Sequence, residues 1–282
     1  MLRSVLYVPA SNARAIEKAR ILACDAVILD LEDAVAPVAK HTARQAAVAA
    51  VIAGGFRAGS VAVRVNALAT EWGAADLAAL AALAATRPAA IVLPKVDGSA
   101  DVTAARAYLG VTPPPVWAMI ETARAMLRLE DIAGAEGLGA LVMGTNDLAR
   151  EMGARLRPDR TSFVGLLSLT VVAARAFGLA VLDGVYNDIG DADGFARQCQ
   201  QAMDLGFDGK TLIHPGQIAP CNAAFTPDAD DVAAARRVVD AFGQPENHAK
   251  GAIALDGRMV ERLHLEQAHK TLALAAAARN EG

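Results

Sequence analysis

Eight short runs rich in valine, isoleucine and leucine recur along the 282-residue chain, and a helix-length, alanine-rich stretch follows each of them. Continuous apolar runs suit strands that are buried on both faces, and helical connections impose parallel pairing with right-handed crossovers. Eight such units predict a closed (β/α)8 TIM barrel. The runs are Ser4–Pro9, Asp25–Glu32, Val61–Asn66, Ala90–Lys95, Val116–Glu121, Ala140–Asp147, Leu179–Tyr186 and Asp208–Pro215.

An open, doubly wound sheet is the competing architecture for a chain that alternates strands and helices. Its usual marker is a Gly-x-Gly-x-x-Gly turn after the first strand. This chain has Pro9-Ala10-Ser11-Asn12 at that place, so the barrel is preferred.

The chain continues well beyond its eighth apolar run. We expect a barrel domain over residues 1–224 and a C-terminal helical segment over residues 225–282, which acts as a lid or an oligomer contact. Within that segment, Pro227 and the acidic residues after it predict a helix that ends near Phe242. The glycine- and proline-containing stretch Gly243–Gly257 is predicted to be a loop, and a last helix is expected from about Arg258 to Ala278.

Charge and composition exclude several classes of protein. A net charge of -4 with interleaved signs argues against a nucleic-acid partner, which would require a basic face. No apolar run approaches the roughly 18 residues of a membrane span, and the N-terminus lacks a secretory apolar segment, so a cytoplasmic location without a membrane partner is expected. The distant Cys24, Cys199 and Cys221 support neither a disulfide framework nor a zinc cluster and are interpreted as small buried thiols. Since the five histidines show no ligand spacing either, any metal must be held by oxygen.

Polar residues gather where the predicted strands end. In TIM barrels the chemistry takes place at this C-terminal face, so we expect these side chains to converge on one mouth. They are Asp30, Glu32, Asp33, Arg64, Asn66, Lys95, Glu121, Asn146, Asp147, Asp183, Lys210 and His214.

Two of these carboxylates, Glu121 and Asp147, end neighbouring strands and together suit a Mg²⁺ ion, which prefers oxygen ligands and keeps part of its hydration. Alternatively, each carboxylate simply caps the helix that follows it. Three further acidic residues, Asp30, Glu32 and Asp33, follow the second strand and are expected to hold the metal's water ligands. With them, the metal interpretation is favoured.

The negative charge at this mouth requires compensation, which Arg64 and Lys95 are positioned to supply. The planar, permanently charged guanidinium of Arg64 also suits a substrate carboxylate or a transition-state oxyanion, and this catalytic and substrate-binding role is preferred. For Lys95 a purely structural counter-ion role stays equally open. His214 lies in a tight turn, Ile213-His214-Pro215-Gly216, and is interpreted as structural.

The same positions carry a family resemblance through Arg3–Pro9, Leu29–Pro37, Arg64–Asn66, Leu93–Val96, Met119–Thr122, Gly209–Pro215 and Asp256–Met259. Over essentially its whole length the chain resembles the citrate lyase beta subunit family of CoA-ester lyases, within the HpcH/HpaI aldolase group, which includes malyl-CoA and citramalyl-CoA lyases.

The resemblance implies a Mg²⁺-dependent barrel, usually a homotrimer or hexamer, in which Glu121 and Asp147 hold the metal. It also implies that Glu121 and Arg64 bind substrate, with Arg64 on a carboxylate or keto oxygen. The expected reaction cleaves or forms a carbon–carbon bond between an acyl-CoA enolate and a 2-keto acid, with malyl-, citramalyl- or citryl-CoA as the thioester.

Two departures from the family pattern bear on the net reaction. Many members carry a Glu-Asp pair where this chain has Asn146-Asp147, and malyl-CoA lyases place an aspartate where this chain has Glu261. The resemblance implies that the residue at this position is an acid/base. Glu261 is therefore the candidate acid/base here, with a longer side chain than aspartate. The stretches Met143–Ala149 and Asp183–Asn187 resemble a branch that includes malyl-CoA thioesterases. Alternatives are a Mg²⁺-dependent thioesterase, an aldolase acting on free keto acids, and a citrate lyase beta-type subunit that requires an acyl-carrier partner.

Overall fold

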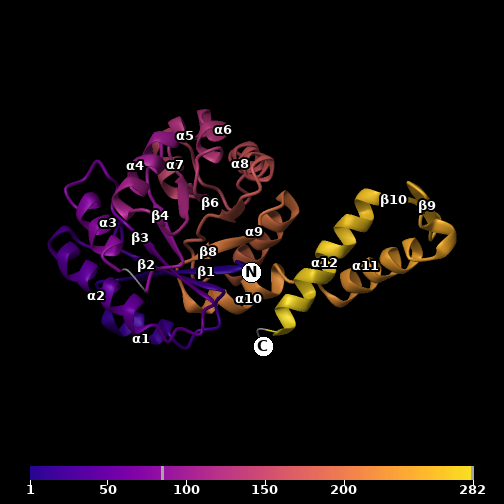
Figure 1. The fold of residues 1–282 in the computed structure, drawn as a ribbon, viewed down its shortest axis with the longest axis horizontal. Coiled ribbons are helices and arrows are strands. Elements are labelled where there is room, and N and C mark those ends of the chain that lie inside the picture. Colours follow the sequence, from indigo (N-terminus) through magenta and orange to yellow (C-terminus); the bar gives the residue numbers. More distant parts are fainter. Residues whose placement is uncertain (84–85, 281–282) are drawn as a thin grey trace. The chain divides into compact units, whose positions relative to one another are not determined.

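Eight parallel strands close into a barrel in the computed structural model, which describes residues 1–83 and 86–280 (Figure 1). The strands pair in chain order, and β8 closes the ring by pairing with β1 from Ser4↔Lys210 to Leu6↔Leu212. Their bounds are β1 Ser4–Pro9, β2 Ala26–Asp30, β3 Ser60–Arg64, β4 Ala90–Leu93, β5 Val116–Ile120, β6 Leu138–Met143, β7 Ala180–Asp183 and β8 Gly209–Leu212. The predicted (β/α)8 barrel is confirmed.

The barrel interior is filled by small and branched side chains from alternate strand positions, among them Val5, Ile28, Ala62 and Val92. Because successive strand residues point to opposite faces, the other apolar side chains pack outward against the helices. This two-sided burial explains why the strands read as continuous apolar runs.

Helices follow the strands and surround them (Figure 1). Several helix ends are fixed locally: the Asn12 side chain accepts from Ala15 N, and Gly153 and Gly206 end their helices in left-handed backbone. The helices are α1 Ala13–Ala19, α2 Lys40–Ala53, α3 Gly73–Ala81, α4 Ser99–Leu109, α5 Ala123–Leu127, α6 Leu129–Ala133, α7 Thr145–Met152, α8 Val164–Ala176, α9 Ala192–Leu205 and α10 Ile218–Ala224, with short 3-10 turns η1 Pro37–Ala39 and η2 Pro215–Gln217.

The sixth strand ends earlier than the sequence predicted. The expected strand Ala140–Asp147 ends at Met143, and Gly144, with φ -102° and ψ 70°, turns the backbone into α7. Asp147 therefore lies in the first turn of a helix rather than at a strand end, as does Asn146. Because the apolar run passes directly into an amphipathic helix, the amino-acid composition does not show where the strand ends and the helix begins.

A second compact unit comprises Ala223–Gly282 together with Met1, whereas Leu2–Asn222 forms the barrel unit. In the second unit α11 (Ala229–Phe242) starts with a capping box between Asp228 and Asp231, and packs against α12 (Arg262–Asn280). The turn η3 (Pro245–Asn247) leads from α11 to a β-hairpin.

The predicted loop and last helix were partly wrong in this unit. The antiparallel strands β9 (Ala252–Leu255) and β10 (Arg258–Glu261) form a hairpin, so the last helix begins at Arg262 instead of Arg258. Asp256 and Gly257 connect the strands with φ values of 49° and 74°. Positive φ at both positions is typical of a type I′ hairpin turn, and Asp-Gly is a preferred sequence for it. The Asp-Gly pair was the overlooked signal. Within the described residues, no helix is both long and apolar enough to span a membrane.

Candidate active site

A cavity of about 310 Å³ opens at the C-terminal ends of the barrel strands, on the face that the sequence predicted. Six residues that were predicted at the mouth line it: Asp30 and Asp33 at and after the end of β2, Arg64 at the end of β3, Glu121 after β5, and Asn146 and Asp147 in the first turn of α7. The other lining residues are Tyr7, Ala34, Met119, Met143, Gly144, Thr145, Val185, Asn187, Thr211 and Ile213.

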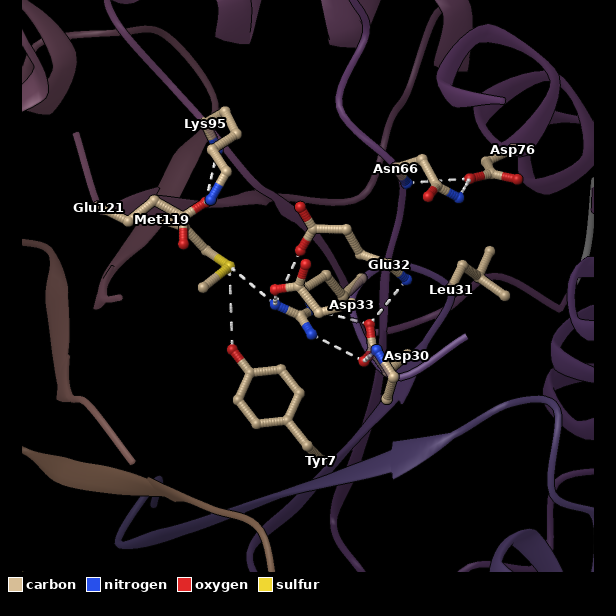
Figure 2. Close-up of polar contacts among 12 residues, drawn as sticks. Tyr7, Asp30, Leu31, Glu32, Asp33, Asn66, Asp76, Lys95, Met119 and Glu121 are labelled. Atoms are coloured by element: carbon tan, nitrogen blue, oxygen red, sulfur yellow. Dashed lines mark hydrogen bonds and ion pairs between the residues drawn. The ribbon is translucent and has the colours of Figure 1, made fainter. Parts of the chain in front are cut away.

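Glu121 and Asp147 meet at this cavity with Lys95 between them. Glu121, which is 1% exposed, accepts a hydrogen bond at Oε1 from the backbone N of Lys95 at 2.8 Å. The Lys95 ammonium lies 3.2 Å from the same Oε1 and also pairs with Asp147 Oδ2. Glu121 and Asp147 thus share the Lys95 ammonium as a partner. The two predicted metal ligands are therefore neighbours (Figure 2 shows Lys95 and Glu121).

Burial and charge act differently on these two carboxyls. Burial raises the pKa of Glu121, and the Lys95 ammonium opposes this only in part. Burial also acts to raise the pKa of Asp147, but the hydrogen bond and charge of Lys95 and the charge of Arg150 outweigh it, so that pKa is lowered. Two adjacent carboxylates of this kind are stabilised by a cation.

The backbone of Lys95 adopts a left-handed conformation, with φ 52°. Such a conformation costs a residue with a side chain of order 1–3 kcal/mol and persists where the surroundings enforce it. Here it directs both the backbone N–H and the ammonium of Lys95 at Glu121. Lys95 thus orients a carboxylate as well as compensating its charge.

Gly144 leaves the space that the Glu121 carboxylate occupies. A Cβ added to Gly144 would lie 2.4 Å from both Cβ and Oε2 of Glu121. Because Glu121 Cβ is fixed by its backbone, rotation of the carboxylate alone would not relieve this contact. The absent side chain at position 144 therefore creates room for a carboxylate at the cavity wall.

Replacing Gly144 with alanine is expected to displace Glu121. We expect Gly144→Ala to lower kcat/KM roughly 100-fold, since a misplacement of about 1 Å at a reacting site is worth that much. Overpacking should also lower the free energy of unfolding by about 1–3 kcal/mol. Gly165→Ala in α8 is the matched control, because a Cβ there would meet nothing within 4 Å. Equal kcat/KM values for the two variants would refute the steric argument.

Arg64 is held by acidic residues of the β2–α2 connection. Its Nε and Nη2 each lie 2.7 Å from a carboxylate oxygen of Asp30, and its Nη1 lies 2.8 Å from Glu32 Oε2. Asp33 lies farther away, at 3.5 Å from Nη1. In this structure the acidic residues thus fix the guanidinium, and their expected role in holding a metal's waters stays a prediction. Burial raises the pKa of Glu32 to about 8, although Arg64 opposes the shift.

A buried lysine that sequence reasoning missed anchors this acidic connection. The Lys40 ammonium donates to the carbonyl oxygens of Leu31 and Glu32 at 2.7 Å each and to Asn66 Oδ1 at 2.6 Å. Asn66 Nδ2 in turn donates to Asp76 Oδ2 at 2.6 Å, as Figure 2 shows. Lys40 and Asp76 lie within helices, where no spacing signal marks them.

Asn66, Asp183 and Lys210, which were predicted at the mouth, lie outside the cavity lining; Asn66 is buried between Lys40 and Asp76. Leu182 faces the barrel interior, so the next residue, Asp183, faces the helix layer. There it pairs with Lys210 at 2.6 Å and with Arg160 at 2.7 Å, fully buried and outside the cavity lining. Asp183 and Lys210 therefore serve the packing of the barrel wall, which corrects their expected place at the mouth.

The structural interpretation of His214 agrees with its contacts, because its Nδ1 accepts from the backbone N of Gly216 at 3.1 Å. The three cysteines are all buried and unbridged. Glu261 ends β10 in the second unit, where its backbone N donates to His264 Nδ1 at 2.9 Å. Its predicted acid/base role stays a prediction.

The donor set at Glu121 and Asp147 fits a magnesium ion. Mg²⁺ is usually held by one or two carboxylates, with water and substrate oxygens completing its octahedron. Within the described ranges, no group of three or more His, Cys, Asp or Glu side chains is placed to hold a metal. Two carboxylates that share the Lys95 ammonium as a partner match a site with one or two protein ligands.

Known proteins resemble this chain in sequence and in fold. Residues 3–215 match the HpcH/HpaI aldolase/citrate lyase family. The chain is 48% identical over 275 residues to the (3S)-malyl-CoA thioesterase of Cereibacter sphaeroides, covering 98% of this chain and 95% of that protein. It is 33% identical to citrate lyase subunit beta of Escherichia coli, covering 97% and 93%. The crystal structure of protein CitE from Mycobacterium tuberculosis in complex with magnesium, acetoacetate and coenzyme A superposes with a TM-score of 0.82 at 33% identity, covering 97% of each chain.

Proposed function

The chain belongs to the HpcH/HpaI aldolase/citrate lyase family, and from this membership we propose that it is a Mg²⁺-dependent CoA-ester lyase. The reaction cleaves or forms a carbon–carbon bond between an acyl-CoA enolate and a 2-keto acid. A malyl-CoA-type thioester is the proposed substrate, because the (3S)-malyl-CoA thioesterase of Cereibacter sphaeroides is 48% identical to this chain.

One observation carries the proposal: a cavity at the C-terminal face brings together two adjacent carboxylates and a guanidinium that is already positioned. Arg64 is fixed at two nitrogens by Asp30, at 2.7 Å each, and it also lines the cavity. The CitE structure from Mycobacterium tuberculosis contains magnesium, acetoacetate and coenzyme A, which supports the same classes of ligand here.

Glu121 and Asp147 would hold the metal, and Arg64 would stabilise a substrate oxygen that gains charge. When bound, Mg²⁺ supplies Lewis acidity and a fixed orientation for the substrate's hydroxy or keto carboxylate. Burial opposes the charge on Arg64, but Asp30 and Glu32 raise its pKa well above the ordinary value, so the guanidinium stays charged. A charge fixed before the reaction stabilises the transition state without reorganisation.

In the cleavage direction the substrate hydroxyl gives its proton to a base, and the carbon–carbon bond breaks. Its electron pair passes to the thioester, which leaves as an enolate and is protonated at carbon. Glu261 is the proposed acid/base for these proton transfers.

Hydrolysis of the thioester is the second candidate function. Sequence identity favours hydrolysis, since the chain is 48% identical to a (3S)-malyl-CoA thioesterase and 33% identical to a citrate lyase beta subunit. The stretches Met143–Ala149 and Asp183–Asn187, which resemble the thioesterase branch, point the same way. In this reaction a water attacks the thioester carbonyl, and free CoA leaves.

Incubating the isolated chain with malyl-, citramalyl- and citryl-CoA in the presence of Mg²⁺ tests both candidates. We expect keto acid to appear while the thioester bond stays intact, and turnover to stop when the metal is chelated. Free thiol that appears with the hydroxy acid would assign hydrolysis instead. The absence of product from all three esters would refute the substrate class and leave the partner-dependent subunit as the alternative.

We further propose a cytoplasmic homotrimer or hexamer, on the basis of the family resemblance. The C-terminal unit, residues 223–282, is the proposed lid or oligomer contact. Sedimentation equilibrium of the full chain and of a chain truncated after residue 222 would test that role. A truncated chain that keeps the same number of subunits per assembly would contradict it.

A further inference from the structure

Tyr7 presents its hydroxyl to the cavity with a weak partner. Tyr7 lies on β1 and lines the cavity, and its Oη donates to Met119 Sδ at 3.9 Å. In residues 1–83 and 86–280 no oxygen or nitrogen accepts from this hydroxyl. A thioether sulfur is a weak acceptor, so the phenol remains available to a better one.

Arg64 points at the same place. Its Nη1 lies 3.8 Å from Met119 Sδ, and its guanidinium carbon lies 4.7 Å from the centre of the Tyr7 ring. The guanidinium therefore lies over the phenol ring, and each group directs one donor at the Met119 sulfur. Tyr7 and Met119 are labelled in Figure 2. The Met119 sulfur occupies the point on which these two donors converge, and methionine is a flexible side chain. A substrate oxygen that displaces this sulfur would accept from both donors.

The surroundings keep the phenol protonated. Burial raises the pKa of Tyr7, Arg64 opposes this, and the carboxylates of Asp30 and Glu121 raise the pKa further. The hydroxyl is consequently a hydrogen-bond donor and not a general base at neutral pH. Such a donor complements an oxygen that becomes negatively charged during the reaction.

The two candidate reactions have one charged oxygen in common. Carbon–carbon cleavage places negative charge on the thioester carbonyl oxygen as the enolate forms. Hydrolysis places charge on the same oxygen when water adds to the carbonyl carbon. A donor pair for this oxygen would serve either reaction.

We propose that the Tyr7 hydroxyl is a second hydrogen-bond donor beside Arg64 Nη1, and that it completes an oxyanion site for the thioester carbonyl oxygen of the substrate. Tyr7 is then a catalytic residue that donates a hydrogen bond and transfers no proton. This inference rests on the proposed function in one respect, namely that the substrate is a thioester. It does not depend on which of the two reactions takes place.

Tyr7→Phe is the decisive variant, because it removes the hydroxyl and keeps the ring beneath Arg64. Loss of one oxyanion donor costs roughly 100- to 1,000-fold in kcat. We expect a loss of that size, with KM, Mg²⁺ affinity and melting temperature little changed. Tyr108→Phe is the matched control, since Tyr108 lies on α4 and is 49% exposed.

A second measurement does not require turnover. Bound acetyl-CoA labelled with ¹³C at its carbonyl should show a lowered infrared carbonyl frequency in the parent protein and a smaller shift in Tyr7→Phe. A role confined to packing would leave this band unchanged and would lower the melting temperature instead.

The outcomes separate the inference from the proposed function. If the parent turns over a CoA ester while Tyr7→Phe keeps kcat within about threefold and the same carbonyl band, the oxyanion site is refuted and the function stands. If the parent neither turns over the esters nor shifts the carbonyl band, the proposed function fails and the inference fails with it.

Discussion

Glu121→Gln and Asp147→Asn are each expected to abolish Mg²⁺-dependent turnover, lowering kcat/KM by at least about 1,000-fold. Metal Lewis acidity is worth several kcal/mol, and each 1.36 kcal/mol is tenfold in rate. Each substitution exchanges a carboxylate for an amide of the same size, so the new side chain should still fit the cavity wall. The loss is therefore one of charge at the proposed metal site.

Binding of Mg²⁺ measured by calorimetry, alongside the melting temperature with and without the metal, checks this expectation. A ligand that binds the folded state raises its stability, so the parent should melt higher with Mg²⁺ and the two variants should not. Glu136→Gln is the matched control, because the Glu136 side chain is 96% exposed. Retained metal affinity in both variants would show that Glu121 and Asp147 are not the ligands.

Asp183→Asn is expected to cause the largest loss of stability, about 3–5 kcal/mol in the free energy of unfolding. Asp183 is fully buried and lies 2.6 Å from Lys210 Nζ and 2.7 Å from Arg160 Nη1. Neutralising this carboxylate leaves two buried cations without its compensating charge, and breaking a buried ion pair costs that much in other proteins. Denaturation with urea at neutral pH measures the difference.

Asp208→Asn is the control for this prediction. Asp208 pairs with Arg175 at 2.7 Å, similar to the buried pairs, but the two side chains are 36% and 47% exposed. An exposed ion pair contributes about 0–1 kcal/mol, so its loss should be small. Comparable losses in the two variants would contradict the argument from burial.

The contribution of the Asp183 carboxylate to the free energy of unfolding should also depend on pH. Burial acts to raise the pKa of Asp183, but Lys210 and Arg160 outweigh it and hold that pKa below the ordinary 3.8. A carboxyl whose pKa is lower in the folded state contributes stability above its unfolded pKa and loses it as the pH falls through the folded pKa. The difference in the free energy of unfolding between the parent protein and Asp183→Asn should therefore be constant near neutral pH. It should become smaller only below about pH 4.

Much of the candidate active site could be predicted from the sequence because the barrel is closed and parallel. Glu121 and Arg64 directly follow or end apolar runs, and a closed parallel barrel brings all such ends to one face. Topology alone therefore places them on the same face of the barrel. Asp147 reaches the same cavity from the first turn of α7, shortly beyond its strand.

The sequence could not show which way a polar residue at a strand end points. Strands buried on both faces lack an alternating pattern, so Asp183 and Lys210 looked like residues of the mouth although they face the helices. Tyr7 and Gly144 were missed for a related reason, since a tyrosine inside an apolar run and a glycine after one have ordinary structural explanations.

The order of apolar runs and helices by itself determined the barrel, and with it the face on which the site lies, because local hydrophobic patterning and parallel pairing admit few topologies. Only the tertiary structure decided which side chains point into the cavity, how Lys95 and Lys40 hold the acidic residues, and that Tyr7 and Arg64 converge on one point. These features depend on contacts between residues far apart in the chain, whose geometry is set by packing rather than by any periodicity of the sequence.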